Sequence, residues 1–298
     1  MFHCIGLIVI GFMIGILSGL FGVGGGFLLV PLLNAVFNIP YNIAVGSSLF
    51  QMVGTTIVCS LKHRGYGHID YKLAGFVLIG SIIGVELGSQ FLMGLKKMGS
   101  FIIHKSSVSK MDFWINIIYI AILSLVGISM FLESKKAKKR APRGGIVDTM
   151  FSQKIKNTKI PPLISLPISN IENISIYFIT GLGFGVGILT GLLGIGGGFI
   201  INPALIYLFG VPTSIAIGTC LFQTIFIAGY GSLSHFFKGN VNFELVACIL
   251  AGSLIGSQLG AKIHKQLRGA HIRYYFSLVI FIAIAIVFFK FLVSLGYL

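Results

Sequence analysis

The chain has 298 residues, of which 55% are hydrophobic and only 10% are charged. A soluble domain carries roughly 25% charged residues, so this chain lacks the polar surface that a water-soluble globule needs. Its net charge of +15 does not indicate a nucleic-acid-binding protein, because the 22 Lys and Arg residues lie almost entirely between apolar stretches. Membrane proteins place basic residues there, and we expect no nucleic-acid partner.

Apolar stretches of about 20 residues recur along the chain, as in proteins that cross a membrane several times. A bilayer accepts only helices or closed barrels, and the alternating ten-residue strands of a barrel are absent from the sequence. We therefore predict an all-α polytopic protein of the cell (inner or plasma) membrane, with about eight transmembrane helices. The clearest stretches are Ile43–Leu61, Leu73–Phe91, Phe113–Leu132, Ile215–Leu233, Phe243–Ala261 and Tyr274–Val293.

The N-terminal apolar stretch has no basic n-region and no A-x-A-like cleavage site, so we expect a first membrane helix there, not a signal peptide. The four cysteines, Cys4, Cys59, Cys220 and Cys248, are scattered and show no metal-ligand spacing. The sequence therefore predicts neither a disulfide framework nor a metal site, and we expect small buried cysteines.

An internal repeat relates the two halves of the chain. Gly15–Met52 aligns without gaps to Gly187–Thr224 at an offset of 172 residues, and 20 of the 38 positions are identical. We predict a tandem duplication, with a first membrane repeat at 1–133 and a second at 174–298. Residues 134–173 are basic and contain prolines, which predicts an extended, mobile linker. We expect each half to pack as one structural lobe.

Each half should begin with a broken helix. Ile5–Phe37 is apolar apart from a cluster of glycines, and one continuous helix of that length would run about 50 Å, well beyond the hydrocarbon thickness. A glycine costs about 1 kcal/mol in a helix interior, so the chain should unwind at Gly22–Gly26 and, in the second half, at Gly194–Gly198. The helices that start near Phe27 and Phe199 would point free N–H groups at an anion. The alternative is that these glycines only permit close packing.

The duplicated block G-[VI]-G-G-G-F-[LI]-[LI]-x-P, followed by [IV]-P-x-x-x-A-[VI]-G-[ST]-x-L-F-Q, resembles the sulfite exporter TauE/SafE family. The resemblance covers both halves of the chain. It implies a multi-spanning transporter of sulfite, sulfoacetate and related sulfur-containing or organic anions. No Lys-Ser or Lys-Thr follows the glycines, so we exclude a nucleotide-binding loop, and we expect no cofactor.

We predict a substrate site between the two repeats, made by the glycine breaks and the polar side chains that follow them. Hydroxyl and amide groups can replace the water shell of an oxyanion, although the same groups also join membrane helices by hydrogen bonds. The candidate residues are Gly24, Gly25, Gly26, Ser47, Ser48, Gln51, Gly196, Gly197, Gly198, Thr219, Cys220 and Gln223.

Glu86 is the only acidic residue well inside an apolar stretch, which makes it a candidate for proton coupling. The alternative is a hydrogen-bonded Glu near a helix end. His63 and His235 end matched spans, and we expect them to anchor those ends at the membrane interface, with a gating or proton role as the alternative. Glycines at every fourth position from Gly80 to Gly88 and from Gly252 to Gly260 predict close helix packing.

The topology depends on the broken helices. If each one crosses once, the halves are parallel and the Lys and Arg residues divide 14 to 8 between the two sides. If each turns back, the halves are inverted and the Lys and Arg residues divide 16 to 6, with the linker on the side that has more of them. This more uneven division favours inverted repeats.

No nucleophile, metal or redox constellation is visible, so we predict a transporter and not an enzyme. The alternatives are a membrane-embedded sulfur-handling redox protein, for which Cys220 would be needed, or a passive anion channel. The expected partners are a small anion and the lipid bilayer.

Overall fold

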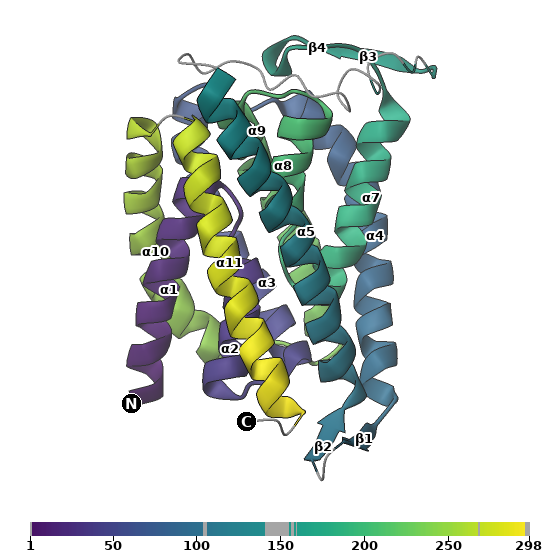
Figure 1. Cartoon of the computed structure of the whole chain (residues 1–298), viewed down its shortest axis with the longest axis vertical. Coiled ribbons are helices and arrows are strands. Elements are labelled where there is room, and N and C mark those ends of the chain that lie inside the picture. Colours follow the sequence, from purple (N-terminus) through teal and green to yellow (C-terminus); the bar gives the residue numbers. More distant parts are fainter. Residues whose placement is uncertain are drawn as a thin grey trace.

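The computed structural model describes residues 2–103, 106–140, 155, 158, 160–267 and 269–295. Nearly all of that part of the chain is helical (Figure 1). Two antiparallel strand pairs, β1–β2 and β3–β4, lie at opposite ends of the molecule. The elements are α1 (Phe2–Phe21), α2 (Gly26–Phe37), α3 (Tyr41–Gly65), α4 (Tyr71–Lys97), β1 (Ser100–Ile103), β2 (Ser106–Ser109), α5 (Lys110–Arg140), β3 (Leu163–Leu166), β4 (Ile171–Ser175), α7 (Ile176–Leu193), α8 (Gly198–Leu208), α9 (Thr213–Phe237), α10 (Phe243–Gln266) and α11 (Gly269–Ser294).

Eight of the helices in the described part are long and apolar enough to cross a membrane, as the sequence predicts. The other two, α2 and α8, are shorter apolar helices. Each follows a glycine break, because α1 ends at Phe21 and α2 begins at Gly26, while α7 ends at Leu193 and α8 begins at Gly198. The predicted breaks are therefore confirmed.

The short helix α2 turns back beside α1. A Cβ on Gly6, near the start of α1, would lie 3.4 Å from the ring of Phe37 at the end of α2. The two helices therefore form a hairpin that enters the bundle and leaves on the same side. In the second half, α7 and α8 run in the same manner from the other end of the molecule (Figure 1).

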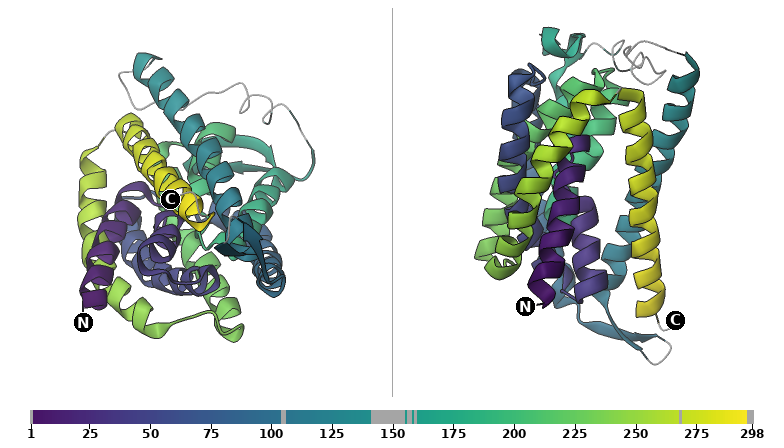
Figure 2. Two further views of the ribbon diagram at one scale, coloured as in Figure 1. Left: turned by 60° about the horizontal axis from the view of Figure 1, so that its bottom comes forward. Right: turned by 90° about the vertical axis from the view of Figure 1, so that its left-hand side faces the viewer.

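The two halves are inverted relative to each other. The third helices of the repeats, α3 and α9, are antiparallel, because Gly46 at the start of α3 lies against Asn240 just after α9. The last helices, α5 and α11, are antiparallel as well, with the ring of Phe113 next to Phe291 and that of Phe131 next to Tyr274. Figure 2 shows α5 and α11 together at one side of the bundle. The uneven division of Lys and Arg residues between the two sides, which favours inverted repeats, agrees with this arrangement.

The halves interlock instead of forming separate lobes, contrary to the expectation from the repeat. The first helix of each half runs parallel to the fourth helix of the other, α1 along α10 and α7 along α4. The glycines at every fourth position of α4 (Gly80 to Gly88) and of α10 (Gly252 to Gly260), here called the glycine ridges, permit this packing. A Cβ on Gly84 would lie 2.3 Å from the Phe184 oxygen, and one on Gly256 would lie 2.1 Å from the Phe12 oxygen. The prediction of close packing at both ridges is confirmed, and the partner helix comes from the opposite half.

A disulfide joins Cys4 of α1 to Cys248 of α10, with the Cα atoms 5.8 Å apart. The prediction that the cysteines form no disulfide is therefore wrong. The two residues are 244 positions apart, and only the parallel packing of α1 on α10 brings them together. Cys59 and Cys220 are free and buried, as expected.

Thiol labelling should separate these two kinds of cysteine. The protein unfolded in detergent without reductant should take up maleimide at Cys59 and Cys220 only, because the other pair is covalently closed. Unfolding after reduction should add Cys4 and Cys248, and intact mass spectrometry counts the adducts. Labelling of all four cysteines without reductant would show that the disulfide does not form.

The middle of the predicted linker lies outside the described residues. At its start, α5 continues to Arg140, and near its end β3 pairs with β4 in the strand pair next to α7. The hydroxyl of Ser169, between these strands, donates to the Asp70 carboxylate at 2.6 Å. Asp70 also accepts from the backbone N–H groups of Lys72 and Leu73 and so caps α4.

Candidate functional site

The two glycine breaks meet inside the bundle. A Cβ on Gly26 would lie 2.2 Å from the carbonyl oxygen of Gly194, and one on Gly198 would lie 2.9 Å from that of Gly22. The first aromatic residues of α2 and α8, Phe27 and Phe199, stack with ring centroids 4.9 Å apart. The amino-terminal ends of the two half-helices therefore lie side by side, between the halves of the protein.

The backbone at the breaks requires glycine. In the first break, Gly24 has φ of +77° and Gly25 has φ of +86°. The corresponding residues of the second break, Gly196 and Gly197, have φ of +71° and +77°. Residues with a Cβ rarely adopt this left-handed region. The glycines therefore serve a non-helical backbone as well as close packing.

One face of α3 and the matching face of α9 pack on the breaks. Met52 of α3 lies against both, because its sulfur would be 2.7 Å from a Cβ on Gly24 and 2.4 Å from one on Gly196. Its repeat counterpart, Thr224 of α9, donates to the Gly196 carbonyl at 3.1 Å. Ser48, one turn before Met52, donates to the Gly194 carbonyl at 3.2 Å.

The other predicted polar residues lie on a neighbouring face of the same helices. The hydroxyl of Ser47 accepts from the backbone N–H of Asn242, at the start of α10, and that of Thr219 accepts from the N–H of Asp70, at the start of α4. Gln51 donates to Ser253 of α10 at 2.7 Å. The structure thus places Ser48 at the breaks, with Cys220 at the equivalent position of α9, whereas Ser47, Gln51 and Thr219 face α10 or α4.

Gln223 is the repeat counterpart of Gln51 and is fully buried. Neither polar atom of its side chain has a hydrogen-bond partner among the described residues, and the Gln51 oxygen also lacks one there. Thr55, which accepts from Gln51, corresponds to Ile227 in the second half, and Ser81, the counterpart of the second Gln51 partner Ser253, donates to Gly183 instead. Each unpaired buried polar group lowers the free energy of unfolding by about 1–3 kcal/mol. These amides are therefore suited to a polar ligand that binds reversibly.

Glu86 of α4 forms an ion pair with Lys238, which caps the end of α9, at 2.9 Å. The carboxylate also accepts from Ser234 at 2.8 Å and from Gln90 at 3.1 Å. Glu86 is therefore hydrogen-bonded across the contact between the two repeats, and its partner Lys238 was not singled out in the sequence.

Both span-ending histidines are buried, so the expectation that they anchor helix ends at the membrane interface is wrong for them. His63 and His235 each have an exposed fraction of 0%. His235 bonds to the carbonyl of Gly191 at 2.9 Å and contacts Asn240 through its other ring nitrogen. It joins α9 to the end of α7.

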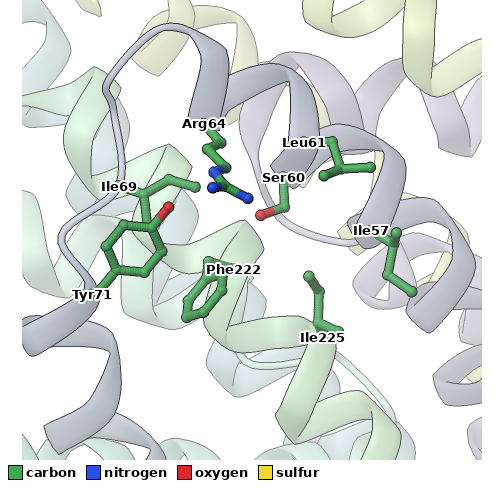
Figure 3. Close-up of a pocket in the computed structure, with 8 residues that line it drawn as sticks. All are labelled: Ile57, Ser60, Leu61, Arg64, Ile69, Tyr71, Phe222 and Ile225. Carbon is green, nitrogen blue, oxygen red and sulfur yellow. The ribbon is translucent and has the colours of Figure 1, made fainter.

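A pocket of about 280 Å³ opens between the end of α3 and α9. Its walls are mainly apolar, and Figure 3 shows the Arg64 guanidinium beside the Ser60 hydroxyl within it. The side chain of Tyr71 lies at its rim. A cation beside a hydroxyl can bind an anion. This pocket lies at the end of α3 that leads to the linker side.

The fold is that of a polytopic membrane protein built from inverted repeats with a re-entrant helix pair in each, an architecture found in many transporters. The sequence profile of the family described as sulfite exporter TauE/SafE matches residues 7–287, and the chain belongs to this family.

Curated relatives agree with this assignment. The "Probable membrane transporter protein YunE" of Bacillus subtilis (strain 168) is 29% identical over 269 residues, which cover 88% of this chain and 89% of the relative. A probable membrane transporter protein of Methanocaldococcus jannaschii is 28% identical over 284 residues, covering 90% of this chain and 88% of the relative. No solved structure matches the chain.

Proposed function

We propose that the protein is a secondary-type exporter of small anions and that the anion binds where the two glycine breaks meet. The observation that carries the proposal is the meeting of the α2 and α8 amino-terminal ends, marked by the Phe27–Phe199 stack. Each end carries a partial positive charge and backbone N–H groups that favour an anion. The family's description adds the substrate class, which is sulfite and related sulfur-containing or organic anions such as sulfoacetate.

The structure corresponds to a closed state of this site. Gly24, Gly25 and Gly26 are buried, Gly24 against Met52, Gly25 against Ile14 and Gly26 against the Gly194 carbonyl of the second hairpin, so an anion enters when the hairpins part. The hydroxyls of Ser48 and Thr224, which lie within donating distance of both a loop carbonyl and a carbonyl of their own helix here, can then turn to donate to the anion. Gln51 and Gln223 lie one residue before Met52 and Thr224, and the unpaired Gln223 NH2 group supplies a further donor after a rotation of the helix.

Glu86 is the proposed proton-coupling group. Its ion pair with Lys238 joins α4 of the first repeat to α9 of the second, so movement between these helices would separate the two charges. A carboxylate that loses its ammonium partner inside a membrane takes up a proton instead. Proton binding would thus be linked to the movement that opens the site.

Anion flux into proteoliposomes tests the proposal. We expect saturable flux of sulfite, sulfate, thiosulfate or sulfoacetate, loss of that flux in Gly25→Ala and Gly197→Ala, and normal flux in Gly185→Ala. A Cβ on Gly185, in α7, would meet nothing within 4 Å, so this variant is the matched control. Glu86→Gln should keep flux and lose its dependence on a pH gradient.

Other outcomes would move the assignment to the alternatives. Flux that does not saturate and shows no counterflow would identify a passive channel. Absence of flux for all four anions under either gradient would contradict the proposed substrate class. A thiol-dependent activity that disappears in Cys220→Ser would favour the redox protein.

A further inference from the structure

Three histidines from distant parts of the sequence lie together at the end of the bundle where α3 and α10 finish. His63 is in the last turn of α3, His68 is in the connection to α4, and His264 is in the last turn of α10. Their nearest ring centroids, those of His63 and His264, are 4.7 Å apart, and each residue offers a ring nitrogen within 4.8 Å of the other two.

The hydrogen bonds around these rings leave nitrogens available. Neither ring nitrogen of His63 has a hydrogen-bond partner of good geometry among the described residues, although the Gly19 backbone lies close, and Nδ1 of His68 also lacks one there. His63 is fully buried, so its unpaired nitrogens are costly as they stand.

His264 is already oriented in the manner of a metal ligand. Its Nδ1 lies 2.9 Å from the carbonyl oxygen of Leu20, at the end of α1. Metal-binding histidines usually donate one ring N–H to a backbone carbonyl or carboxylate, which fixes the ring and leaves the other nitrogen for the ion. Nε2 of His264 would therefore be the coordinating atom.

The second repeat provides an internal comparison. At the offset of 172 residues, His63 corresponds to His235, His68 to Asn240 and His264 to Leu92. In the second half the single histidine is satisfied by Gly191 and Asn240 without any ion. The fold therefore needs only one histidine at this place, and the end of the bundle where α3 and α10 finish carries two more, His68 from the first repeat and His264 from the second.

We propose that His63, His68 and His264 bind one transition-metal ion of the zinc class, with a fourth position open to water or another ligand. Three ligand atoms at most 4.8 Å apart lie no more than about 2.8 Å from a common centre. A Zn–N bond is about 2.0–2.1 Å long, so each nitrogen must shift inward by less than about 1 Å. Zn²⁺ is the first candidate, and Cu²⁺, Ni²⁺ and Co²⁺ share its affinity for imidazole.

The surroundings select against hard cations. The group contains no carboxylate, and a basic side chain, Lys265, lies over the ring of the neighbouring Tyr66 at 5.4 Å. Ca²⁺ and Mg²⁺ need several oxygen ligands, whereas neutral imidazoles bind zinc-class ions through directed bonds.

The site has a structural consequence that rests on the proposed function. A bound ion would tie α3 and its following connection to the end of α10, and His264 is bonded to Leu20, two residues before the first glycine break at Gly22. Metal occupancy would therefore hold the first hairpin in place and slow transport. Metal binding itself is independent of any transport activity.

Metal content tests the site without any transport assay. The full-length protein, purified in detergent and stripped with a chelator, is dialysed against Zn²⁺, and the bound metal is measured by mass spectrometry. We expect one Zn²⁺ per chain, at least a tenfold loss of affinity in His264→Leu and His68→Asn, and no change in His271→Asn. Each cluster variant copies the residue at the equivalent position of the other repeat, Asn240 for His68 and Leu92 for His264, and His271 is exposed outside the group.

Visible absorption spectroscopy of the Co²⁺-loaded protein is a second test, because Co²⁺ held by imidazoles in a tetrahedral site has strong visible absorption bands. These bands should appear in the unaltered protein and be absent from His68→Asn, which lies in a connection and leaves the helices intact. Equal Zn²⁺ binding by the unaltered protein and both cluster variants, or no binding above that of a protein denatured before dialysis, would overturn the proposal.

Discussion

Gly26→Ala should abolish anion flux, because the added methyl group enters the contact between the two hairpins. Its Cβ would lie 2.2 Å from the Gly194 carbonyl oxygen and 2.7 Å from the end of the Met52 side chain. Methionine can move, but the carbonyl belongs to the opposite break and cannot shift without opening the pair. Overpacking of this kind costs about 1–3 kcal/mol, so we expect a lower melting temperature and at least a tenfold loss of flux.

The comparison with Gly197→Ala separates steric from conformational effects. Gly26 is not among the residues with positive φ, so alanine there is excluded by its neighbours alone. At Gly197 the nearest atom to an added Cβ is 3.3 Å away, but φ is +77° and the cost is backbone strain. Melting is followed with a thiol-reactive dye that detects Cys59 and Cys220 as they become exposed. Normal flux and melting in Gly26→Ala would show that the breaks need not touch during transport.

The duplication, the helix breaks, the eight spans and the packing ridges could all be predicted from the sequence. These features are encoded locally, in apolar length, in glycine spacing and in similarity between the halves. The contacts between distant helices could not. The Cys4–Cys248 disulfide and the His63–His264 contact depend on α10 lying beside α1 and α3, which no local pattern reveals.

The candidate site residues that the sequence singles out lie on more than one helix face. Successive residues of a helix are rotated by about 100°, so Gln51 and Met52 cannot both face the same neighbour. The sequence drew attention to the polar residue, Gln51, whereas Met52 is the side chain that packs on both breaks. The full burial of Met52 and the hydrogen bond from Thr224 to Gly196 became evident only in three dimensions.

The orientation in the membrane follows from two independent features. With inverted repeats, the Lys and Arg residues divide 16 to 6 in favour of the side that carries the linker, which the positive-inside rule places in the cytoplasm. The disulfide lies near the N-terminal end of α1, at the opposite end of the molecule from β3 and β4 (Figure 1). Disulfides persist in oxidising compartments, so both features predict a cytoplasmic linker.

Gly84→Leu should prevent stable assembly of the two halves. Gly84 lies on the α4 ridge, where an added Cβ would meet the backbone of α7 at two points, 2.3 Å from the Phe184 oxygen and 2.8 Å from the Ile188 nitrogen. Backbone atoms of a packed helix cannot rotate away, so the helices must separate along their contact. We expect a loss of several kcal/mol, which is a large part of a typical folding free energy of about 5–15 kcal/mol. Size-exclusion chromatography and dye-detected melting measure the result.

Gly94→Leu is the matched control, because Gly94 lies on the same helix and a Cβ there would meet nothing within 4 Å. The equivalent change on the other ridge, Gly256→Leu, should be less severe under oxidising conditions. Its Cβ would clash with Phe12 of α1, but the Cys4–Cys248 bond keeps α1 and α10 joined. Reduction should remove that advantage and make the two variants alike. If Gly84→Leu and Gly94→Leu melt at the same temperature, close packing of α4 on α7 does not hold the halves together.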